Sequence, residues 1–376
     1  MKTITAIFTI SLIFADRCYT FTSTPVPRIT LDEFLISPTY NTPIIIKDIS
    51  SSSALEQIVD DLMVTCGNDV VSLQHKQKRR NGMRTNIYDV TFRESIEYMM
   101  DSQHGDSYFA FCEGLLPASH ALHQKWEQIR EKPFPQTENW FDFFSPSLKP
   151  TDAIIVAGSG STSTLHRDPF EWTGTSLCLE GVKIWRFILP PNDDVRVVDE
   201  TLDSYRLNSV AWEEENGESA VLSAGWQSDL SLYGSVDKEF PNALDWMKLE
   251  EKDPVLFRKK IEQMTPMLCP NEDALNALNR ISDGTSQATF ATAIQSSGDL
   301  LLIPAHCWHQ TFAPVPSVAI ASQRCSASVD GANVVRHILD LSKNRSEAVP
   351  DLLKQSEFSE GSGREVVDAL FSFVLR

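Results

Sequence analysis

The sequence predicts a mostly β fold, either a sandwich or a barrel, with helices before and after it. After Asp152 the chain consists of short apolar segments bounded by Gly and Pro, the pattern of an all-β domain. Hydrophobic residues make up 42% of the 376 residues, enough for a large core, so extensive disorder is excluded. The sequence has no internal repeats, which excludes a solenoid.

The charge composition limits the classes of partner. Lys and Arg number 33 against 51 Asp and Glu, a formal net charge of −18. General nucleic-acid binding needs a basic surface, so the composition argues against it. No apolar run approaches the ~20 residues that span a bilayer, so we expect no membrane span. The seven cysteines include no C-x-x-C pair, which excludes a zinc ribbon and a dense disulfide scaffold.

Residues 1–20 have the features of a signal or targeting segment. Lys2 precedes an apolar stretch from Ile4 to Ala15, and small residues lie shortly before a cleavage position after Thr20. The alternative is a frayed tail without a targeting role. We therefore expect routing to the secretory pathway, an endomembrane lumen or an organelle, with the cytoplasm as the alternative.

Residues 21–139 are expected to form an α/β segment that packs on the barrel. Pro43 to Ile46 is predicted to be a buried strand, and Ser53 to Val64 has apolar residues at helical spacing. Thr91 and Glu94 have the spacing of a capping box, which predicts that a helix begins there.

The sequence HKQKRRNGMR, His75 to Arg84, is predicted to be a solvated basic loop that connects a hairpin. The alternative is a docking loop for an acidic partner. The histidines His75, His104, His120, His123 and His337 are each expected to be surface or capping residues rather than metal ligands.

Residues 140–330 are expected to form the barrel. A long insertion at about 192–288 contains a helical piece near Leu256 to Met264 and is expected to lie outside the barrel. Residues 331–376 are expected to form short helices, either core or the face of a homodimer. The predicted barrel strands are Asp152 to Gly158, Thr175 to Leu179, Lys183 to Leu189, Thr289 to Ile294, Leu300 to Ile303 and Val318 to Ser322.

His166-Arg167-Asp168 is the most informative triplet. A protein-kinase catalytic loop also begins with H-R-D, but here Pro169 replaces its Leu and no D-F-G follows. On a strand edge, His166 and Asp168 leave the same face, because side chains alternate with period 2. Two such ligands and one distant His make the facial triad of non-heme Fe(II) oxygenases.

The distant histidine is expected in the segment GDLLLIPAHCWH, which begins at Gly298. Its apolar strand, proline and turn would bring either His306 or His309 to the rim of the barrel. Between the two histidine segments, Lys183 lies in a strand among apolar neighbours. An inward-facing lysine there would be costly without an anionic partner.

Three segments together resemble the JmjC-type, cupin-like oxygenases that use Fe(II) and 2-oxoglutarate. They are TSTLHRDP, LEGVKIW with its closing Pro-Pro, and GDLLLIPAHCWH, in this order, and the resemblance covers roughly Phe141 to Ser326. It implies a double-stranded β-helix, the barrel of the cupin and jelly-roll folds. It also implies O2 as a second cosubstrate and an oxidoreductase activity.

The resemblance also implies roles for individual residues. His166, Asp168 and His309 would be the metal ligands, which leaves His306 outside the site. Lys183 would bind the distal carboxylate of 2-oxoglutarate. Two further residues, Ser163 and Ser176, fall at polar positions that contact the cosubstrate in the family.

We expect a hydroxylase that acts on a protein side chain, since no zinc finger or chromatin reader is visible in the sequence. Two other readings are kept. One is a JmjC oxygenase directed at tRNA or at methyl-lysine or methyl-arginine, for which the basic segment His75 to Arg84 is the support for tRNA. The other is a cupin that binds a metal without turnover, against which the intact ligand set argues.

Overall fold

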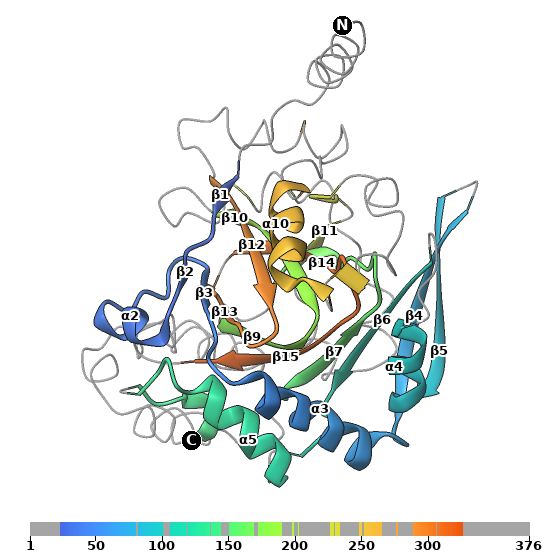
Figure 1. Ribbon diagram of the computed structural model, residues 1–376, viewed down its shortest axis with the longest axis horizontal. Helices are drawn as coiled ribbons and strands as arrows, with labels where there is room; N and C mark the ends of the chain where they lie inside the picture. Colours follow the sequence, from blue (N-terminus) through green and yellow to red (C-terminus); the bar gives the residue numbers. More distant parts are fainter. Residues whose placement is uncertain are drawn as a thin grey trace, which may run out of the picture.

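Two mixed β-sheets form the framework of the protein (Figure 1). The computed structural model describes residues 23–325, except 80–81, 101–105, 118, 136, 144–149, 169–171, 306 and most of 190–288. Within these residues strands dominate and helices are few, which confirms the mostly β prediction.

The smaller sheet has six strands in the order β1-β12-β10-β14-β8-β11. Their bounds are Thr24–Pro25 (β1), Thr289–Ser296 (β12), Val182–Leu189 (β10), Trp308–Phe312 (β14), Leu165–Arg167 (β8) and Trp226–Ser228 (β11).

The larger sheet has nine strands in the order β2-β3-β13-β9-β15-β7-β6-β4-β5. Their bounds are Arg28–Ile29 (β2), Ile44–Ile46 (β3), Leu300–Ile303 (β13), Thr173–Glu180 (β9), Ser317–Arg324 (β15), Ala153–Ala157 (β7), Asp106–Glu113 (β6), Val70–Arg79 (β4) and Gly82–Thr91 (β5).

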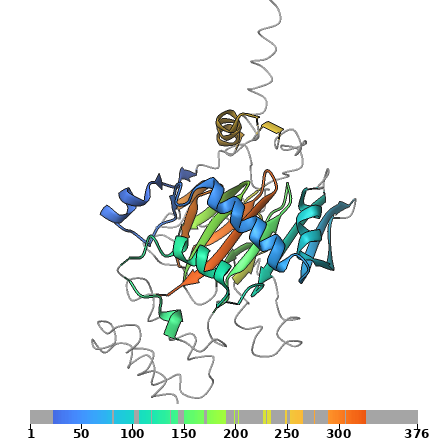
Figure 2. The ribbon, with the colours of Figure 1, turned by 60° about the horizontal axis from the view of Figure 1, so that its bottom comes forward.

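Helices cover the outer face of the larger sheet, and α3 runs across it in Figure 2. Leu55, Ile58 and Leu62 of α3 form one buried cluster with Val156 of β7 and Ile320 of β15. Burial of each such side chain contributes ~1.5–3 kcal/mol relative to exposure. The helices are α2 (Leu31–Ile36), α3 (Ser52–Cys66), α4 (Phe92–Met100), α5 (Ala121–Arg130), the 3₁₀ turn η1 (Trp140–Phe143) and α10 (Pro254–Met264).

The predicted start of α4 is confirmed. The hydroxyl of Thr91 accepts a hydrogen bond from the backbone N–H of Glu94 at 3.2 Å, and the Glu94 carboxylate accepts one from the backbone N–H of Thr91 at 2.7 Å. These reciprocal bonds satisfy amides that the first turn of a helix leaves without partners, so the helix begins here.

The N-terminal segment extends the larger sheet as well as packing on it. Strands β6, β4 and β5 continue the sheet beyond β7, and β2 and β3 continue it beyond β13. The basic segment predicted as a loop belongs instead to the long β4–β5 hairpin, with Arg79 opposite Gly82. The segment thus belongs to a hairpin as expected, but the prediction of a loop was wrong, because its residues pair in the ladder of β4 and β5.

The insertion lies only partly outside the two sheets. Helix α10 packs on the outer face of the smaller sheet, where Phe257 and Ile261 contact the cluster that contains Val182 and Ile184. Strand β11, however, is the edge strand of the smaller sheet and pairs with β8. The expectation that the insertion lies outside the barrel therefore holds for α10 and is wrong for β11.

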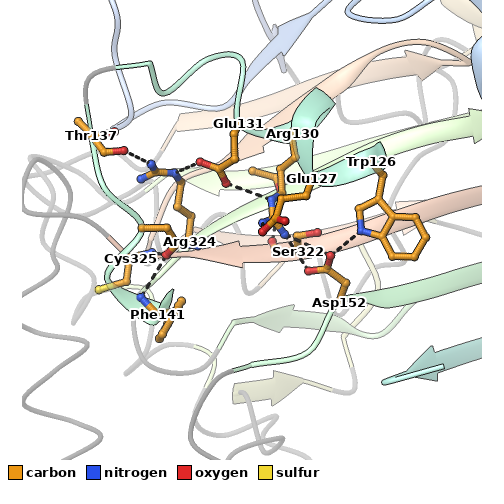
Figure 3. Close-up of polar contacts among 12 residues, drawn as sticks. Trp126, Glu127, Arg130, Glu131, Thr137, Phe141, Asp152, Ser322, Arg324 and Cys325 are labelled. Carbon is orange, nitrogen blue, oxygen red and sulfur yellow. Dashed lines mark hydrogen bonds and ion pairs between the residues drawn. The ribbon is translucent and has the colours of Figure 1, made fainter. Parts of the chain in front are cut away.

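A buried polar cluster fixes α5 to the start of β7, as Figure 3 shows. The Asp152 carboxylate accepts hydrogen bonds from Trp126 Nε1 at 2.7 Å and Arg130 Nη1 at 2.9 Å, and His123 Nε2 lies 3.0 Å from it. Burial alone would raise the pKa of Asp152, but His123, Arg130 and Trp126 together lower that pKa to about 2. The expectation that His75 and His123 are surface or capping residues is wrong, because both are buried.

The same cluster continues to the end of β15. Arg324 donates a hydrogen bond to the Glu131 carboxylate at 3.1 Å and another to the backbone carbonyl of Thr137. Its guanidinium also lies 4.1 Å from the ring centroid of Phe134. Every ionised group in the cluster thus has a partner of opposite charge or a strong hydrogen bond, as buried charges require.

Two sequence predictions lie outside the described residues. They are the targeting segment at residues 1–20 and the terminal helices with their homodimer face at residues 331–376. In the part of the chain that the structure describes, no helix has the length and apolar character needed to cross a membrane.

Candidate metal centre

Two strands of the smaller sheet bring the two histidines of the site together. His166 of β8 lies directly opposite His309 of β14 in an antiparallel pair, and their ring centroids are 4.2 Å apart. Asp168 follows β8 by one residue, so its carboxylate leaves the same face as His166. The three side chains therefore converge, although His166 and His309 are 143 positions apart in the sequence.

The donor atoms have the spacing of a metal site. Asp168 Oδ1 lies 3.9 Å from the Nε2 atom of His166 and 3.9 Å from that of His309. Two donors that each bind one ion at ~2.1 Å are at most ~4.2 Å apart, so both separations fit a shared ion. All three ligand atoms lie within 4.8 Å of one another. The group could therefore hold a metal ion.

Hydrogen bonds set the tautomer of both histidines. His166 Nδ1 lies 2.8 Å from the backbone carbonyl of Thr164, and His309 Nδ1 lies 2.9 Å from that of Cys307. A carbonyl only accepts, so each Nδ1 carries the proton and each neutral ring presents the lone pair of Nε2. This is the outer-shell arrangement that orients histidine ligands in metal sites. The residues therefore fit a divalent metal.

The three ligands differ in exposure. The His309 side chain is 3% exposed, whereas His166 is 27% and Asp168 30% exposed. Burial is the main cause that lowers the pKa of His309, and the charge of His166 adds to it, while Asp168 opposes it. The ring of His309 is therefore neutral at pH 7, the form that binds a metal. The open side of the site lies at His166 and Asp168.

Gly174 of β9 leaves room for the carboxylate ligand. A Cβ atom at this position would lie 3.0 Å from Asp168 Oδ2 and 3.2 Å from Ile303 Cβ. The Ile303 side chain is buried, so the contact would be relieved mainly by movement of Asp168. Any larger residue at 174 would therefore disturb the ligand set.

The structure places Ser163 beside the ligand strands. Its hydroxyl accepts a hydrogen bond from the Thr311 N–H at 2.9 Å and donates one to the Thr164 carbonyl at 3.0 Å. The same Thr164 carbonyl accepts the His166 Nδ1 proton. Ser163 therefore ties the start of β8 to β14 and helps to orient His166; contact with a cosubstrate stays a prediction.

Lys183 points into the space between the two sheets. Its neighbours Val182 and Ile184 belong to the cluster under α10, on the opposite face of β10. Trp185, two residues on, belongs instead to the cluster that joins the two sheets. Burial lowers the pKa of Lys183 to about 8, although nearby Cys178 opposes the shift. Lys183 is 2% exposed and, among the described residues, forms no ion pair with a carboxylate.

Ser176 lies in the same interior region as Lys183. Its hydroxyl is fully buried and donates to Gln295 Oε1 at 3.4 Å, and Gln295 lies directly opposite Lys183 on β12. The structure therefore brings together two groups of predicted residues, with Ser163 beside the metal ligands and Ser176 beside the lysine.

Two residues of this region were not predicted from sequence. They are Gln295 and Trp185. Gln295 Oε1 accepts a hydrogen bond from Trp185 Nε1 at 2.9 Å, and the Trp185 ring lies 4.9 Å from Lys183 Nζ. The sequence signal for Gln295 is that a polar residue follows the apolar segment TFATAI. Its partners depend on strand register, which the sequence alone does not give.

Neither a scan against models of protein families nor a search of curated proteins gives a match to this chain.

Proposed function

We propose that this protein is an Fe(II)- and 2-oxoglutarate-dependent dioxygenase of the JmjC type that hydroxylates a C–H bond on a protein side chain. The observation that carries the proposal is the joint presence of two sites between the same pair of sheets. One is a His-Asp-His group that could bind a metal, and the other is the buried, anion-free lysine Lys183.

The order of the strands supports the finer fold proposal, a double-stranded β-helix. From β7 to β10 and again from β12 to β15, successive strands alternate between the larger and the smaller sheet. Strands β7, β9, β13 and β15 lie together in the larger sheet, and β8, β10, β12 and β14 in the smaller one. A barrel formed by such alternation presents its interior side chains between the two sheets.

In this proposal, His166 and His309 bind Fe(II) through Nε2 and Asp168 binds it through a carboxylate oxygen. The chemistry that bound Fe(II) would supply is oxidative decarboxylation of 2-oxoglutarate by O2, coupled to insertion of one oxygen atom into a C–H bond. The carbonyls of Thr164 and Cys307 hold both imidazoles in the metal-binding tautomer.

The ammonium of Lys183 binds the distal carboxylate of 2-oxoglutarate. Lys183 Nζ and the centroid of the His309 ring lie 4.9 and 5.8 Å from the centroid of the Trp185 ring, so the lysine and this metal ligand lie in the same interior region. The interior cluster around Trp185 and Phe187 excludes water from this end of the site. In such a low-dielectric setting, an ammonium–carboxylate pair is stronger than in water.

A protein is the proposed substrate class, because the chain as a whole is acidic. The basic residues of the β4–β5 hairpin are the feature that would favour tRNA instead. Secretory or endomembrane routing is likewise a proposal from residues 1–20 of the sequence.

The test is conversion of 2-oxoglutarate to succinate by the purified full chain with Fe(II) and O2. We expect slow conversion without substrate, which the Asp168→Ala variant lacks. Candidate peptides that raise the rate and gain one oxygen atom, measured by mass spectrometry, would identify the substrate. Metal binding with no succinate under any condition would contradict the proposal and favour the non-catalytic cupin.

A further inference from the structure

The buried ammonium of Lys183 has an aromatic ring as its partner in the anion-free protein. Lys183 Nζ lies 4.9 Å from the centroid of the Trp185 ring, within the ~6 Å over which a cation is attracted to a ring face. Among the described residues, no carboxylate pairs with this lysine and no hydrogen bond to its Nζ is present. The ring therefore offsets part of the cost of burying the charge.

The position of that ring is fixed by Gln295. Trp185 Nε1 donates to Gln295 Oε1 at 2.9 Å, while Gln295 Nε2 donates to the carbonyls of Ser176 at 2.7 Å and Asp299 at 3.0 Å. Both Nε2 partners are acceptors and the Trp185 partner is a donor, so only one orientation of the amide satisfies all three bonds. Gln295 is fully buried and cannot exchange these bonds for water.

Along β10, Trp185 stands between Lys183 and Phe187, the residue opposite His309 on β14. The centroid of its ring is 5.8 Å from that of His309, and the ring packs parallel to Phe187 with a centroid distance of 6.2 Å. Trp185 is therefore near both the lysine and one of the metal-site histidines.

We propose that Trp185, held in place by Gln295, is a positioning residue that pairs with the Lys183 ammonium in the anion-free protein and yields it to the carboxylate of a bound dicarboxylate. The inference rests on the proposed function for the identity of the anion, 2-oxoglutarate. The pairing of ring and lysine does not depend on that identity.

The contact with Trp185 explains how the Lys183 ammonium can be buried in an apolar interior before an anion binds. A cation–π contact between desolvated groups contributes more than one at the surface, yet less than a charge-assisted hydrogen bond to a carboxylate. The ring thus holds the ammonium toward the interior without competing with the anion. A carboxylate side chain in place of Trp185 would occupy the lysine and block the anion.

A double-mutant cycle in the full chain tests the pairing. We compare Trp185→Leu and Lys183→Met, singly and together, by calorimetric melting without metal or anion. We expect Trp185→Leu to lower Tm by about 2–4 °C more in the presence of Lys183 than in the Lys183→Met background. Phe187→Leu is the matched control, because it removes a ring from the same face of β10; its Tm loss should be equal in both backgrounds.

Equal Tm losses for Trp185→Leu in both backgrounds would overturn the inference. If Trp185→Leu does not fold, Trp185→Phe replaces it; the phenyl face keeps part of the coupling, and absence of any coupling has the same meaning. The cycle needs no ligand, so it decides the inference even if the proposed function fails.

A second measurement adds 2-oxoglutarate with Mn(II), which does not support turnover, and uses Mn(II) alone as the reference. Binding is measured by titration calorimetry on the wild-type protein. Where 2-oxoglutarate binds, we expect the Tm coupling between Trp185 and Lys183 to fall by at least half. An unchanged coupling would overturn the proposal that Lys183 leaves Trp185 for the anion. No binding of 2-oxoglutarate would contradict the proposed function and leave the ligand-free cycle to decide this inference.

Discussion

Two buried charged regions of this protein differ in how their groups are partnered. Around Asp152, on the outer side of the larger sheet, each charged group meets another group of the chain, with distances of 2.7–3.2 Å to Trp126, Arg130 and their neighbours. Between the sheets, the Lys183 ammonium is also buried, but it lies 4.9 Å from the Trp185 ring centroid and pairs with no carboxylate of the described residues. The Asp152 cluster therefore satisfies its charges within the chain, whereas the charge of Lys183 is the one that we propose binds a ligand.

The largest expected effect is on the ligand region. His309→Ala removes one of three donors, so Fe(II) affinity should fall by more than the ~10–100-fold that loss of an outer-shell partner costs. Isothermal titration under anaerobic conditions measures it, and circular dichroism verifies the fold. His306→Ala, at a residue outside the described ones, is the control and should bind as the wild type. The reverse result would reassign the distal ligand.

In the Asp152 region the expected effect is on stability. Asp152→Asn leaves the buried Arg130 without its principal partner, so the free energy of unfolding should fall by about 3–5 kcal/mol. Asp61→Asn is the matched control, because it breaks an exposed ion pair between α3 and Lys125 of α5 and should cost at most ~1 kcal/mol. Urea unfolding measures both. Equal losses of unfolding free energy in the two variants would show that the Asp152 cluster stabilises the fold no more than an exposed ion pair.

Lys183→Met should weaken ligand binding but stabilise the ligand-free protein. Affinity for 2-oxoglutarate should weaken by ~2–5 kcal/mol, as when one partner of a buried charge pair is lost. The ligand-free protein should become more stable at pH 7 by up to about 3 kcal/mol, because burial lowers the pKa of Lys183 from 10.5 to about 8. Calorimetry and urea unfolding measure the two effects. Unchanged cosubstrate dependence would contradict the 2-oxoglutarate assignment.

The two regions should also differ in pH dependence. The folded pKa of Asp152, about 2, is below its unfolded value, so its contribution of about 2–3 kcal/mol is complete above pH ~4 and lost as pH falls to ~2. The folded pKa of Lys183 is also lowered, so ligand-free stability should rise as pH increases from about 8 to 10.5. Unfolding curves across pH test both expectations. Asp152→Asn should lack the loss of stability at acid pH, and Lys183→Met should lack the rise in stability at alkaline pH.

The smallest expected effect concerns Ser163, which joins the start of β8 to β14. Ser163→Ala leaves the Thr311 N–H without its acceptor, so we expect a loss of about 1–2 kcal/mol in stability and about tenfold in Fe(II) affinity. Ser72→Ala, at an exposed hydroxyl on β4, is the control and should change neither. Wild-type affinity in Ser163→Ala would show that His166 is oriented without this serine.

Sequence reasoning predicted the parts of this protein that depend on local pattern. The strand at Ile44–Ile46, the helix α3 and the capping box of α4 follow from apolar spacing and side-chain chemistry, and each is present. The same holds for His166 and Asp168, whose i, i+2 spacing places them on one face of a strand wherever that strand lies.

The remaining features depend on contacts between distant segments. The short β8 and β11 have too few residues for a periodic pattern. They form because they pair with each other and because β8 also pairs with β14. The cluster at Asp152 joins residues that are 22 to 29 positions apart, and Gln295 meets Ser176 across 119 positions. Such pairs follow from register and layer packing, which a single sequence does not specify.

The edge strand β11 also has a kinetic consequence. His166 lies on a strand of three residues whose neighbours on either side, β11 and β14, follow it in the chain by about 60 and about 140 residues. Contacts of such long sequence separation form late, after the local hairpins, because loop closure costs entropy before the pairing rewards it. During synthesis, the group of three ligands can therefore form only after the insertion and His309 have been added to the chain that contains His166 and Asp168. At the proposed metal site, uptake of the ion would then report the completion of folding, and a chain interrupted within the insertion would lack the third ligand, His309.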